Sequence, residues 1–172
     1  MQVTPLAAPK SQRKAQPVAG SDYPTLDYVR LHESAVAPVR AYDESAGYDL
    51  SAVLLNAQGR EKTLSLAPGT TALVPTGLAL RPPSGYLVLI CSRSGFAAKG
   101  VFVANAPGVV DPDYTGEIKV ILINAGIQPF YVKHGERIAQ ALVVPFAALP
   151  LQEFHSFPET LRGDKGFGST GR

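Results

Sequence analysis

The sequence predicts a single all-β domain, and three observations lead to this prediction. Of the 172 residues, 16 are glycine and 15 are proline, so a helix of a dozen residues finds few uninterrupted stretches. From Leu26 onward, apolar and polar residues alternate in short runs, which is the period-2 pattern of half-buried strands. Turn-forming clusters such as Pro68-Gly69 and Pro107-Gly108 separate these runs at spacings that suit a sandwich or a barrel.

The expected strands are short, and the expected helix is a single turn. The residues Phe96-Ala97-Ala98-Lys99 favour a helix and Gly100 can end it, so we expect a helical turn at Ser94–Lys99. The predicted strands, in chain order, are Tyr28–Leu31, Lys62–Leu66, Thr71–Val74, Tyr86–Cys91, Glu117–Ile123 and Arg137–Val143.

Charge and cysteine content exclude several classes of protein. The formal net charge is +2, from 16 basic and 14 acidic residues, and three of the basic residues, Lys10, Arg13 and Lys14, fall in the first twenty positions. Outside these three, 13 basic residues stand against 14 acidic ones, which argues against the broad basic surface that binding to a nucleic-acid duplex requires. Cys91 is the only cysteine, so no internal disulfide can form and a reducing compartment is expected.

The two ends of the chain are expected to lie outside the folded domain. Residues 1–24 are rich in Ala, Pro, Gln and Ser, which predicts a disordered leader before a β domain at residues 25–160. The sequence has neither an apolar stretch long enough to cross a bilayer nor the apolar core of a secretory signal. We therefore expect a soluble protein of the cytoplasm or nucleus with no membrane partner. A mitochondrial address in the basic leader is the less favoured alternative.

The last residues, 161–172, form a glycine-rich arm that we expect to be flexible. Its four glycines leave backbone N–H groups able to point at an anion, and Ser169 and Thr170 add hydroxyl donors. Basic side chains, Arg162 among them, add positive charge, and Phe167 adds a flat apolar ring. This set suits the phosphates and the base of a nucleotide, with a solubilising tail as the alternative.

The segment from Asn105 to Gly116 is the most specific motif in the body of the chain. Two valines lead into Asp111, and a Pro-Asp-Tyr-Thr-Gly stretch predicts a tight turn, so we expect a hairpin with Tyr114 at its tip. Apolar walls around Asp111 would suit it to act as a general base for water. The amide of Asn105 can pair with an amide-like base edge. An ordinary structural turn is the alternative.

Three shorter motifs place polar side chains at the ends of strands. Asp49 stands between apolar residues where a strand begins and can face a cation, while Arg93 and its neighbouring serines follow a buried strand and can bind an anion. Arg137 and Gln140 lie three positions apart and so on opposite faces of a regular strand, with one facing a ligand and the other bracing the fold. An ordinary turn aspartate and exposed strand residues are the alternatives.

Taken in order over residues 46–171, these five motifs resemble those of the homotrimeric dUTPases, whose fold is a β jelly roll. The two most specific are Gly-Val-Val-Asp-Pro-Asp-Tyr-Thr-Gly at residues 108–116 and Gly-Phe-Gly-Ser-Thr-Gly at residues 166–171. The resemblance implies a jelly-roll-like distorted β-barrel with one short helix, and a hydrolase that cleaves dUTP to dUMP and pyrophosphate. Such an enzyme limits uracil incorporation into DNA and supplies dUMP for dTMP synthesis.

The resemblance also implies roles for individual residues. Asp111 matches the carboxylate that deprotonates the water attacking the α-phosphorus, with Gln140 and Arg162 completing the catalytic set. Asp49 matches a carboxylate that reaches Mg²⁺ on the triphosphate through water, so Mg²⁺ is the expected cofactor. The residues implied to bind substrate are Arg93, Ser94, Gly95, Asn105, Gly108, Val110, Tyr114, Lys119, Phe167, Gly168, Ser169 and Thr170.

Within that substrate set, Asn105 matches the residue that reads uracil and Tyr114 the ring on which the deoxyribose packs. Phe167 matches the ring that lies over the uracil when the arm closes. The implied partners are dUTP and two further copies of the chain, because in this family three chains share each site and the arm comes from a different subunit than the hairpin. No stable nucleic-acid partner is expected.

Three alternatives fit the sequence less well. The dCTP deaminases share the fold and a similar Asp-Pro turn, but Ile121 takes the place of their glutamate. The intact Asp111, Tyr114 and arm speak against a catalytically silent, dUTPase-like regulator. The missing Gly-x-x-x-x-Gly-Lys-Ser/Thr loop speaks against a general nucleoside-triphosphate hydrolase. Lys165 departs from the family, where many members have glycine, so the closure geometry of the arm can differ modestly.

Overall fold

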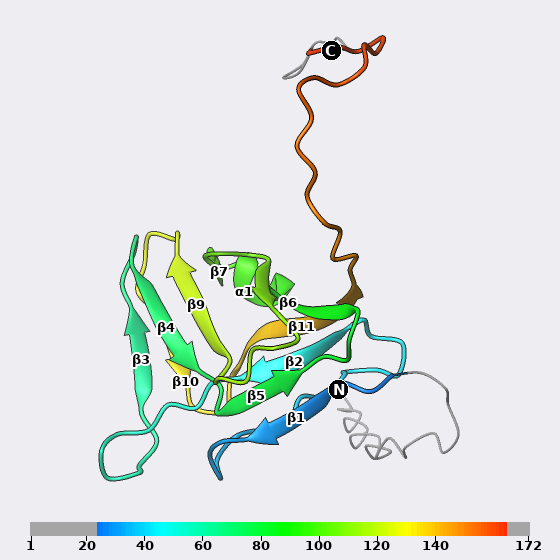
Figure 1. Ribbon diagram of the computed structural model, residues 1–172. Helices are drawn as coiled ribbons and strands as arrows, with labels where there is room; N and C mark the ends of the chain where they lie inside the picture. Colours follow the sequence, from blue (N-terminus) through cyan, green and yellow to red (C-terminus); the bar gives the residue numbers. More distant parts are fainter. Residues whose placement is uncertain (1–23, 165–172) are drawn as a thin grey trace, which may run out of the picture.

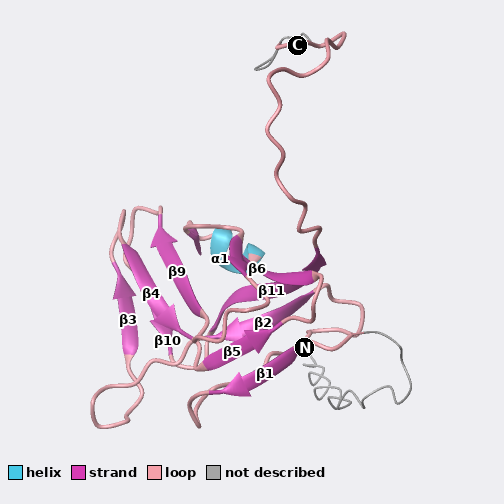
Figure 2. Ribbon diagram, in the orientation of Figure 1, coloured by secondary structure: helices cyan, strands magenta, loops and turns pink. Residues whose placement is uncertain are grey.

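The computed structural model describes residues 24–164, and almost all regular structure in this range is β-strand (Figure 2). The predicted all-β class is therefore confirmed. Residues 24–164 contain no helix of the length and apolarity that crossing a membrane requires. The elements in chain order are β1 (Asp27–Arg30), β2 (Gly47–Ser51), β3 (Thr63–Leu66), β4 (Thr71–Pro75), β5 (Leu78–Arg81), β6 (Tyr86–Cys91), α1 (Ser94–Ala97), β7 (Val101–Val103), β8 (Gly108–Val110), β9 (Lys119–Asn124), β10 (Phe130–Lys133) and β11 (Arg137–Pro145).

The strands pair antiparallel and form four sheets (Figure 1). The largest has the order β2-β11-β6-β8, and a three-stranded sheet has the order β4-β9-β7. Two smaller sheets pair β1 with β5 and β10 with β3. Between residues 24 and 164 the sheets do not join into one closed barrel, so the expected barrel is open in this chain.

The six predicted strands are all present, and their ends differ from the prediction by at most two residues. The predicted helix is present as well, but α1 ends two residues earlier, at Ala97. Gly100 follows it with a φ of +79°, the left-handed conformation that glycine adopts most easily. The six predicted ranges do not include β5, β7, β8 or β10, which have three or four residues each, and β2 was expected only as a strand that begins near Asp49.

The predicted hairpin around Asp111 is wrong. Strand β8 pairs with β6, with Val110 opposite Val88, whereas β9 pairs with β4 and β7. The turn between β8 and β9 spans residues 111–118, which is longer than the two to five residues of an ordinary hairpin loop. The chain therefore crosses from one sheet to another at this turn.

The sheets enclose an apolar core that fixes the strand ends near the site. On β9, Val120 and Leu122 are buried while Lys119 is exposed, which is the alternation expected of a half-buried strand. Phe96 of α1 is buried and packs edge-on against Phe130, with ring centroids 5.0 Å apart. This contact anchors the turn that precedes α1.

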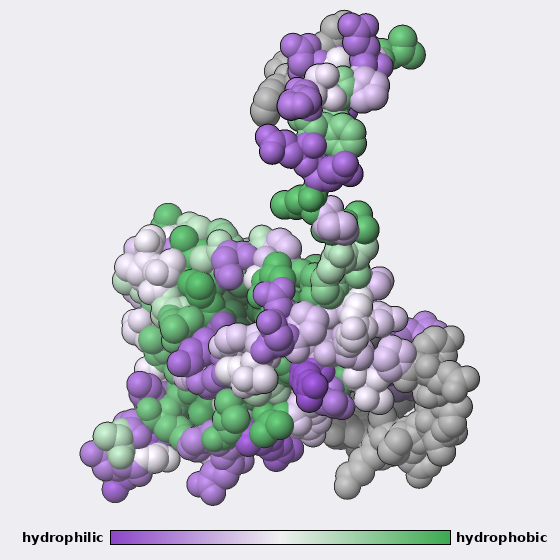
Figure 3. Space-filling model, viewed as in Figure 1, coloured by the Kyte–Doolittle hydropathy of each residue, from purple (hydrophilic) through white to green (hydrophobic). Residues whose placement is uncertain are grey.

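Beyond β11 the chain leaves the body of the protein. Residues 146–164 contain no strand or helix and extend away from the sheets (Figure 1). This segment carries exposed apolar side chains, among them Leu151, Phe157 and Leu161, and Figure 3 shows green apolar patches along it. Of the expected leader only Pro24 is described, and of the expected arm only residues 161–164 are, so the rest of both predictions lies outside the described residues.

Candidate active site

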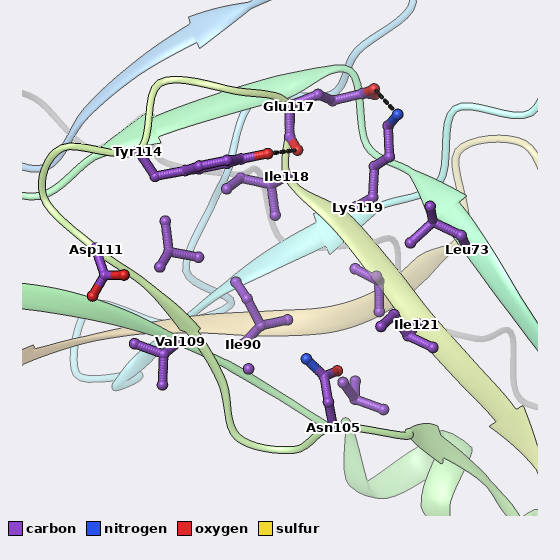
Figure 4. A pocket seen from close by; sticks show the side chains of 14 residues that line it. Leu73, Ile90, Asn105, Val109, Asp111, Tyr114, Glu117, Ile118, Lys119 and Ile121 are labelled. Carbon is purple, nitrogen blue, oxygen red and sulfur yellow. Dashed lines mark hydrogen bonds and ion pairs between the residues drawn. The ribbon is translucent and has the colours of Figure 1, made fainter.

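One pocket of about 390 Å³ lies between β8 and β9, beside the turn that joins them. Its walls are mostly apolar, and Figure 4 shows Ile90 and Val109 between Asp111 and Tyr114 on one side and Asn105 on the other. The lining residues are Leu73, Ile90, Val103, Asn105, Gly108, Val109, Val110, Asp111, Tyr114, Glu117, Ile118, Lys119, Val120 and Ile121. Few polar groups at the rim of an apolar hollow are typical of a site that orients a small ligand.

Gly108 gives the Asn105 amide its place in this pocket. A Cβ atom added at Gly108 would come within 3.1 Å of the Asn105 Nδ2 atom, so a larger residue would displace the amide. The amide and the backbone of β8 therefore lie side by side. Such a pair offers both donors and acceptors to one edge of a planar ligand.

Tyr114 is held at the rim by a contact with the backbone. Its hydroxyl donates to the Glu117 carbonyl oxygen at 3.1 Å (Figure 4), and a Cβ atom at Gly116 would lie 2.5 Å from that hydroxyl. The glycine thus leaves room for the tyrosine, which remains 46% exposed. A partly exposed aromatic face fixed in this way can stack against a sugar or a base.

Glu117 braces the same turn and was not among the predicted site residues. Its Oε1 atom accepts a hydrogen bond from the Gly77 backbone N–H at 2.9 Å, and its Oε2 atom lies 3.6 Å from the Lys119 ammonium. Lys119, a predicted site residue, is therefore paired at the pocket rim. The sequence carries no local signal for the Gly77 contact, because forty residues separate the two groups.

Asp111 follows the buried Val110 but is itself exposed. The apolar walls expected around this carboxylate are not formed by the single chain. Its backbone carbonyl accepts from the Tyr114 N–H at 3.2 Å, which keeps the two side chains on one turn. Because the carboxylate is accessible at the rim of the pocket, it can take a proton from a water molecule there.

A second pocket, of about 530 Å³, brings the other polar motifs together. Its lining residues are Ala41, Ser45, Ala46, Gly47, Asp49, Arg93, Ser94, Gly95 and Gln140. Both oxygens of Asp49 accept charged hydrogen bonds of 2.8 Å, one from Arg93 Nε and one from Arg137 Nη1. The turn from Arg93 to Gly95 adds backbone and hydroxyl donors, so the pocket suits an anion with several oxygens.

Gln140 lies over the same face of the sheet as Asp49. The two residues are opposite each other on β11 and β2, and the Gln140 amide donates to the Ser92 carbonyl at 3.0 Å. Gly47 makes this possible, because a Cβ atom there would meet Gln140 Oε1 at 2.6 Å. The amide is therefore fixed at the edge of the pocket.

The prediction that Arg137 and Gln140 lie on opposite faces is wrong. The register of β11 against β2 shifts between Arg137 and Ala139, which is a β-bulge or a similar irregularity. Such a shift changes the alternation by one residue. As a result, Arg137 reaches the carboxylate of Asp49, the residue opposite Gln140.

The predicted site residues thus fall into separate groups on one chain. Asn105, Gly108, Val110, Asp111, Tyr114 and Lys119 meet at the first pocket, whereas Asp49, Arg93, Ser94, Gly95 and Gln140 meet at the second. Arg162 is exposed near the end of the extended C-terminal segment. Phe167, Gly168, Ser169 and Thr170 lie outside the described residues.

Asp49 is the carboxylate in the second pocket that can face a cation. Across residues 24–164 no three His, Cys, Asp or Glu side chains come together as a metal site would require. Each Asp49 oxygen already accepts one bond from an arginine, and a carboxylate offers about four lone-pair positions. The remaining lone pairs can accept hydrogen bonds from the waters of a Mg²⁺ ion that arrives on an anionic ligand, but they make no site of direct ligands for the metal alone.

Cys91 ends strand β6, next to the Ser92–Gly95 turn, and is only partly exposed. Burial raises the pKa of its thiol, since the surrounding protein disfavours the thiolate. The side chain is therefore a poor nucleophile at neutral pH.

The fold and the two pockets define a small all-β protein with one mostly apolar pocket that has a few polar groups at its rim and a second pocket suited to an anion. The family model for dUTPase matches residues 33–171. A deoxyuridine 5'-triphosphate nucleotidohydrolase of Brucella melitensis biotype 2 is 45% identical over 156 residues, which is 89% of this chain and 97% of that protein. The protein of the same name from Brucella suis biovar 1 gives the same values. The chain belongs to the dUTPase family.

Solved structures agree with this assignment. The dUTPase of Staphylococcus bacteriophage 80alpha, solved with dUpNHpp, superposes with a TM-score of 0.71 at 28% identity, covering 86% of this chain and 99% of that one. A mutant of the 80alpha enzyme gives a TM-score of 0.74 at 27% identity, with 84% and 98% covered. The likeness therefore extends over most of both chains.

Proposed function

We propose that this chain hydrolyses dUTP to dUMP and pyrophosphate, with Asp111 as the general base. The observation that carries the proposal is the first pocket, where Asp111, Tyr114 and Asn105 surround an apolar hollow. Membership of the dUTPase family supplies the reaction, and the pocket supplies residues with the chemistry to perform it.

In this proposal the first pocket selects the base and the sugar. Asn105 and the β8 backbone pair with the edge of uracil, and cytosine presents the reversed donor and acceptor pattern. A base that leaves buried polar groups unpaired is rejected by a factor of about 10⁴ or more. The Tyr114 ring packs on the deoxyribose and leaves no room for a 2′-hydroxyl.

The chemical step is an attack of water on the α-phosphorus. Asp111 accepts a proton as the water oxygen forms its bond to phosphorus, and the bond to the bridging oxygen breaks with its electron pair leaving on pyrophosphate. A positioned base of this kind contributes roughly 10²–10⁴ in rate. The remaining acceleration comes from orientation and from charges that stabilise the transition state.

The second pocket supplies those charges. Arg93, Ser94 and the Gly95 N–H bind phosphate oxygens, and Gln140 orients the oxygens near the attacking water. Asp49 would hold a hydrated Mg²⁺ ion through the waters of that ion. Such an ion, brought by the triphosphate, would supply positive charge to offset the charge of the phosphate oxygens.

We further propose a homotrimer in which the two pockets of one site come from different chains. The exposure of Asp111 and of the apolar side chains in residues 146–161 supports this arrangement, since both would gain cover from a neighbour. The arm of a further chain, with Arg162, Phe167, Gly168, Ser169 and Thr170, closes over the nucleotide. Closure excludes water and completes the site only when substrate is present.

The test is the release of pyrophosphate from dUTP, dCTP, dTTP and UTP, each with Mg²⁺ and with EDTA, while the nucleotide products are identified. Mg²⁺-dependent conversion of dUTP alone to dUMP supports the proposal. Tight binding of dUTP without turnover would contradict it and favour a silent regulator. Light scattering at the assay concentration tests the assembly, with a mass three times that of the 18.2 kDa chain expected and a monomer contradicting the shared site.

A further inference from the structure

The carboxylate of Asp49 is shared between two arginines. Arg93 Nε lies 2.8 Å from Oδ1, and Arg137 Nη1 lies 2.8 Å from Oδ2. The Asp49 side chain is 12% exposed, that of Arg93 24% and that of Arg137 54%. The three groups therefore carry a net charge of about +1 beside the second pocket, which favours an anionic ligand.

Arg137 approaches this cluster from outside the pocket. Asp49 and Arg93 line the pocket, and Arg137 is not one of its lining residues. The shift in the register of β11 turns the Arg137 side chain toward Asp49. The same residue also accepts a hydrogen bond at its backbone carbonyl from Arg93 Nη1, at 3.0 Å.

Arg93 thus donates two hydrogen bonds that depend on Arg137. One goes to the Asp49 carboxylate, which Arg137 also binds, and the other goes to the Arg137 backbone carbonyl. A guanidinium has five N–H donors, of which one is used on Asp49 and one on the Arg137 carbonyl. The remaining donors are left for phosphate oxygens in the pocket. Without the Arg137 side chain, Asp49 Oδ2 loses its partner, and the carboxylate can turn to bind Arg93 through two parallel bonds. That closed pair would carry no net charge and would offer fewer donors to a ligand.

We propose that Arg137 is a positioning residue for the triphosphate. Arg137 binds Asp49 Oδ2 from outside the pocket and so prevents Asp49 from pairing with Arg93 through both oxygens. Arg93 therefore keeps its charge and its remaining N–H groups turned toward the phosphates. This inference rests on the proposed function. Arg137 acts through Asp49, so it tunes binding of the β- and γ-phosphates without touching the base or the sugar. A residue that only stabilises the fold would weaken every nucleotide alike.

The test compares binding of dUpNHpp, a triphosphate analogue, with binding of dUMP by calorimetry in the presence of Mg²⁺. Arg137→Gln is expected to weaken dUpNHpp binding by about tenfold or more, because the loss of Arg137 changes how the Asp49 carboxylate holds Arg93, and to leave dUMP binding nearly unchanged. Arg137→Lys keeps the charge and is expected to recover part of the loss. Arg60→Gln, at an exposed arginine in the loop between Leu55 and Glu61, is the matched control.

A double-mutant cycle with Asp49→Asn separates a positioning role from a direct one. If Arg137 acts through Asp49, adding Arg137→Gln to Asp49→Asn changes dUpNHpp affinity much less than it does in the wild-type chain. An equally large effect in both backgrounds, or an equal loss of dUpNHpp and dUMP binding, would overturn the inference. Wild-type turnover of dUTP is measured in the same preparation, so failure of the proposed function is seen separately as an inactive wild-type enzyme.

Discussion

Replacing Asp49 by asparagine should destabilise the protein measurably, because it removes the acceptor that two arginines share. Asparagine keeps one oxygen acceptor but presents an NH₂ group to the other guanidinium, so one of the two 2.8 Å bonds is lost. If the bond to Arg93 is lost, the cost is about 1.5–3 kcal/mol, as for hydrogen bonds to charged groups. If the bond to the more exposed Arg137 is lost, solvent screening limits the cost to about 0.2–1 kcal/mol.

Loss of the negative charge also leaves the two guanidiniums facing each other, so we expect a total loss of about 1–3 kcal/mol. For a domain of this size, each kcal/mol lowers Tm by roughly 2–4 °C, which gives a decrease of roughly 2–12 °C. The assay is thermal unfolding followed by circular dichroism at one fixed protein concentration, because assembly makes Tm depend on concentration.

The control is Asp43→Asn, which makes the same charge change at an exposed position and should move Tm by less than about 2 °C. The Asp49→Asn effect should also shrink at high salt, since the bond to Arg137 is half exposed. An Asp49→Asn variant as stable as the wild type would refute the view that the ion pairs of Asp49 with Arg93 and Arg137 stabilise the fold at the second pocket.

Three further outcomes follow from the site and its supports. Tyr114→Ala should reduce the preference for dUTP over UTP by about tenfold or more, measured as a ratio of kcat/KM values, whereas Tyr114→Phe keeps the ring and should keep the preference. Burial raises the pKa of the Cys91 thiol, so at pH 8 the thiolate fraction should be lower in the folded protein than in the unfolded protein. Iodoacetamide should therefore label Cys91 more slowly before unfolding than after it, and equal labelling rates would contradict this. Gly100→Ala should lower the free energy of unfolding, measured in urea, by about 1–3 kcal/mol. The φ of Gly100 is +79°, and a Cβ atom there would lie 2.9 Å from the Gly126 backbone N. An unchanged urea midpoint would contradict this and show that the turn relaxes.

Strand positions could be predicted where an apolar run or a clear alternation was bounded by turn-forming residues. The six residues of β6 are an unbroken apolar run after Ser84-Gly85, and both ends of that strand match the prediction. The three-residue strands β7 and β8 show too little alternation to be recognised. Turn-forming residues after Asp111 correctly predicted a turn but not the pairing of its flanking strands, because pairing depends on contacts far apart in the sequence.

The residue types at the site were predictable, whereas their exact neighbours were not. The motifs pointed to Asp111, Tyr114 and Asn105, and the structure brings these three to one pocket. The position of Arg137 could not be predicted, because the change in register within β11 leaves no mark on the period-2 pattern. The bracing contact of Glu117 with Gly77 is equally invisible in the sequence, since it joins separate elements.

The most direct test of the central claim is single-turnover hydrolysis of dUTP by the Asp111→Asn variant, with its dUTP affinity measured alongside. Asp113→Asn, two residues further along the same turn and also exposed, is the matched control and should remain active. If Asp111 is the general base, the variant binds dUTP about as tightly as the wild type but hydrolyses it about 10²–10⁴-fold more slowly. Hydrolysis at the wild-type rate would contradict the assignment of Asp111 and with it the proposed mechanism.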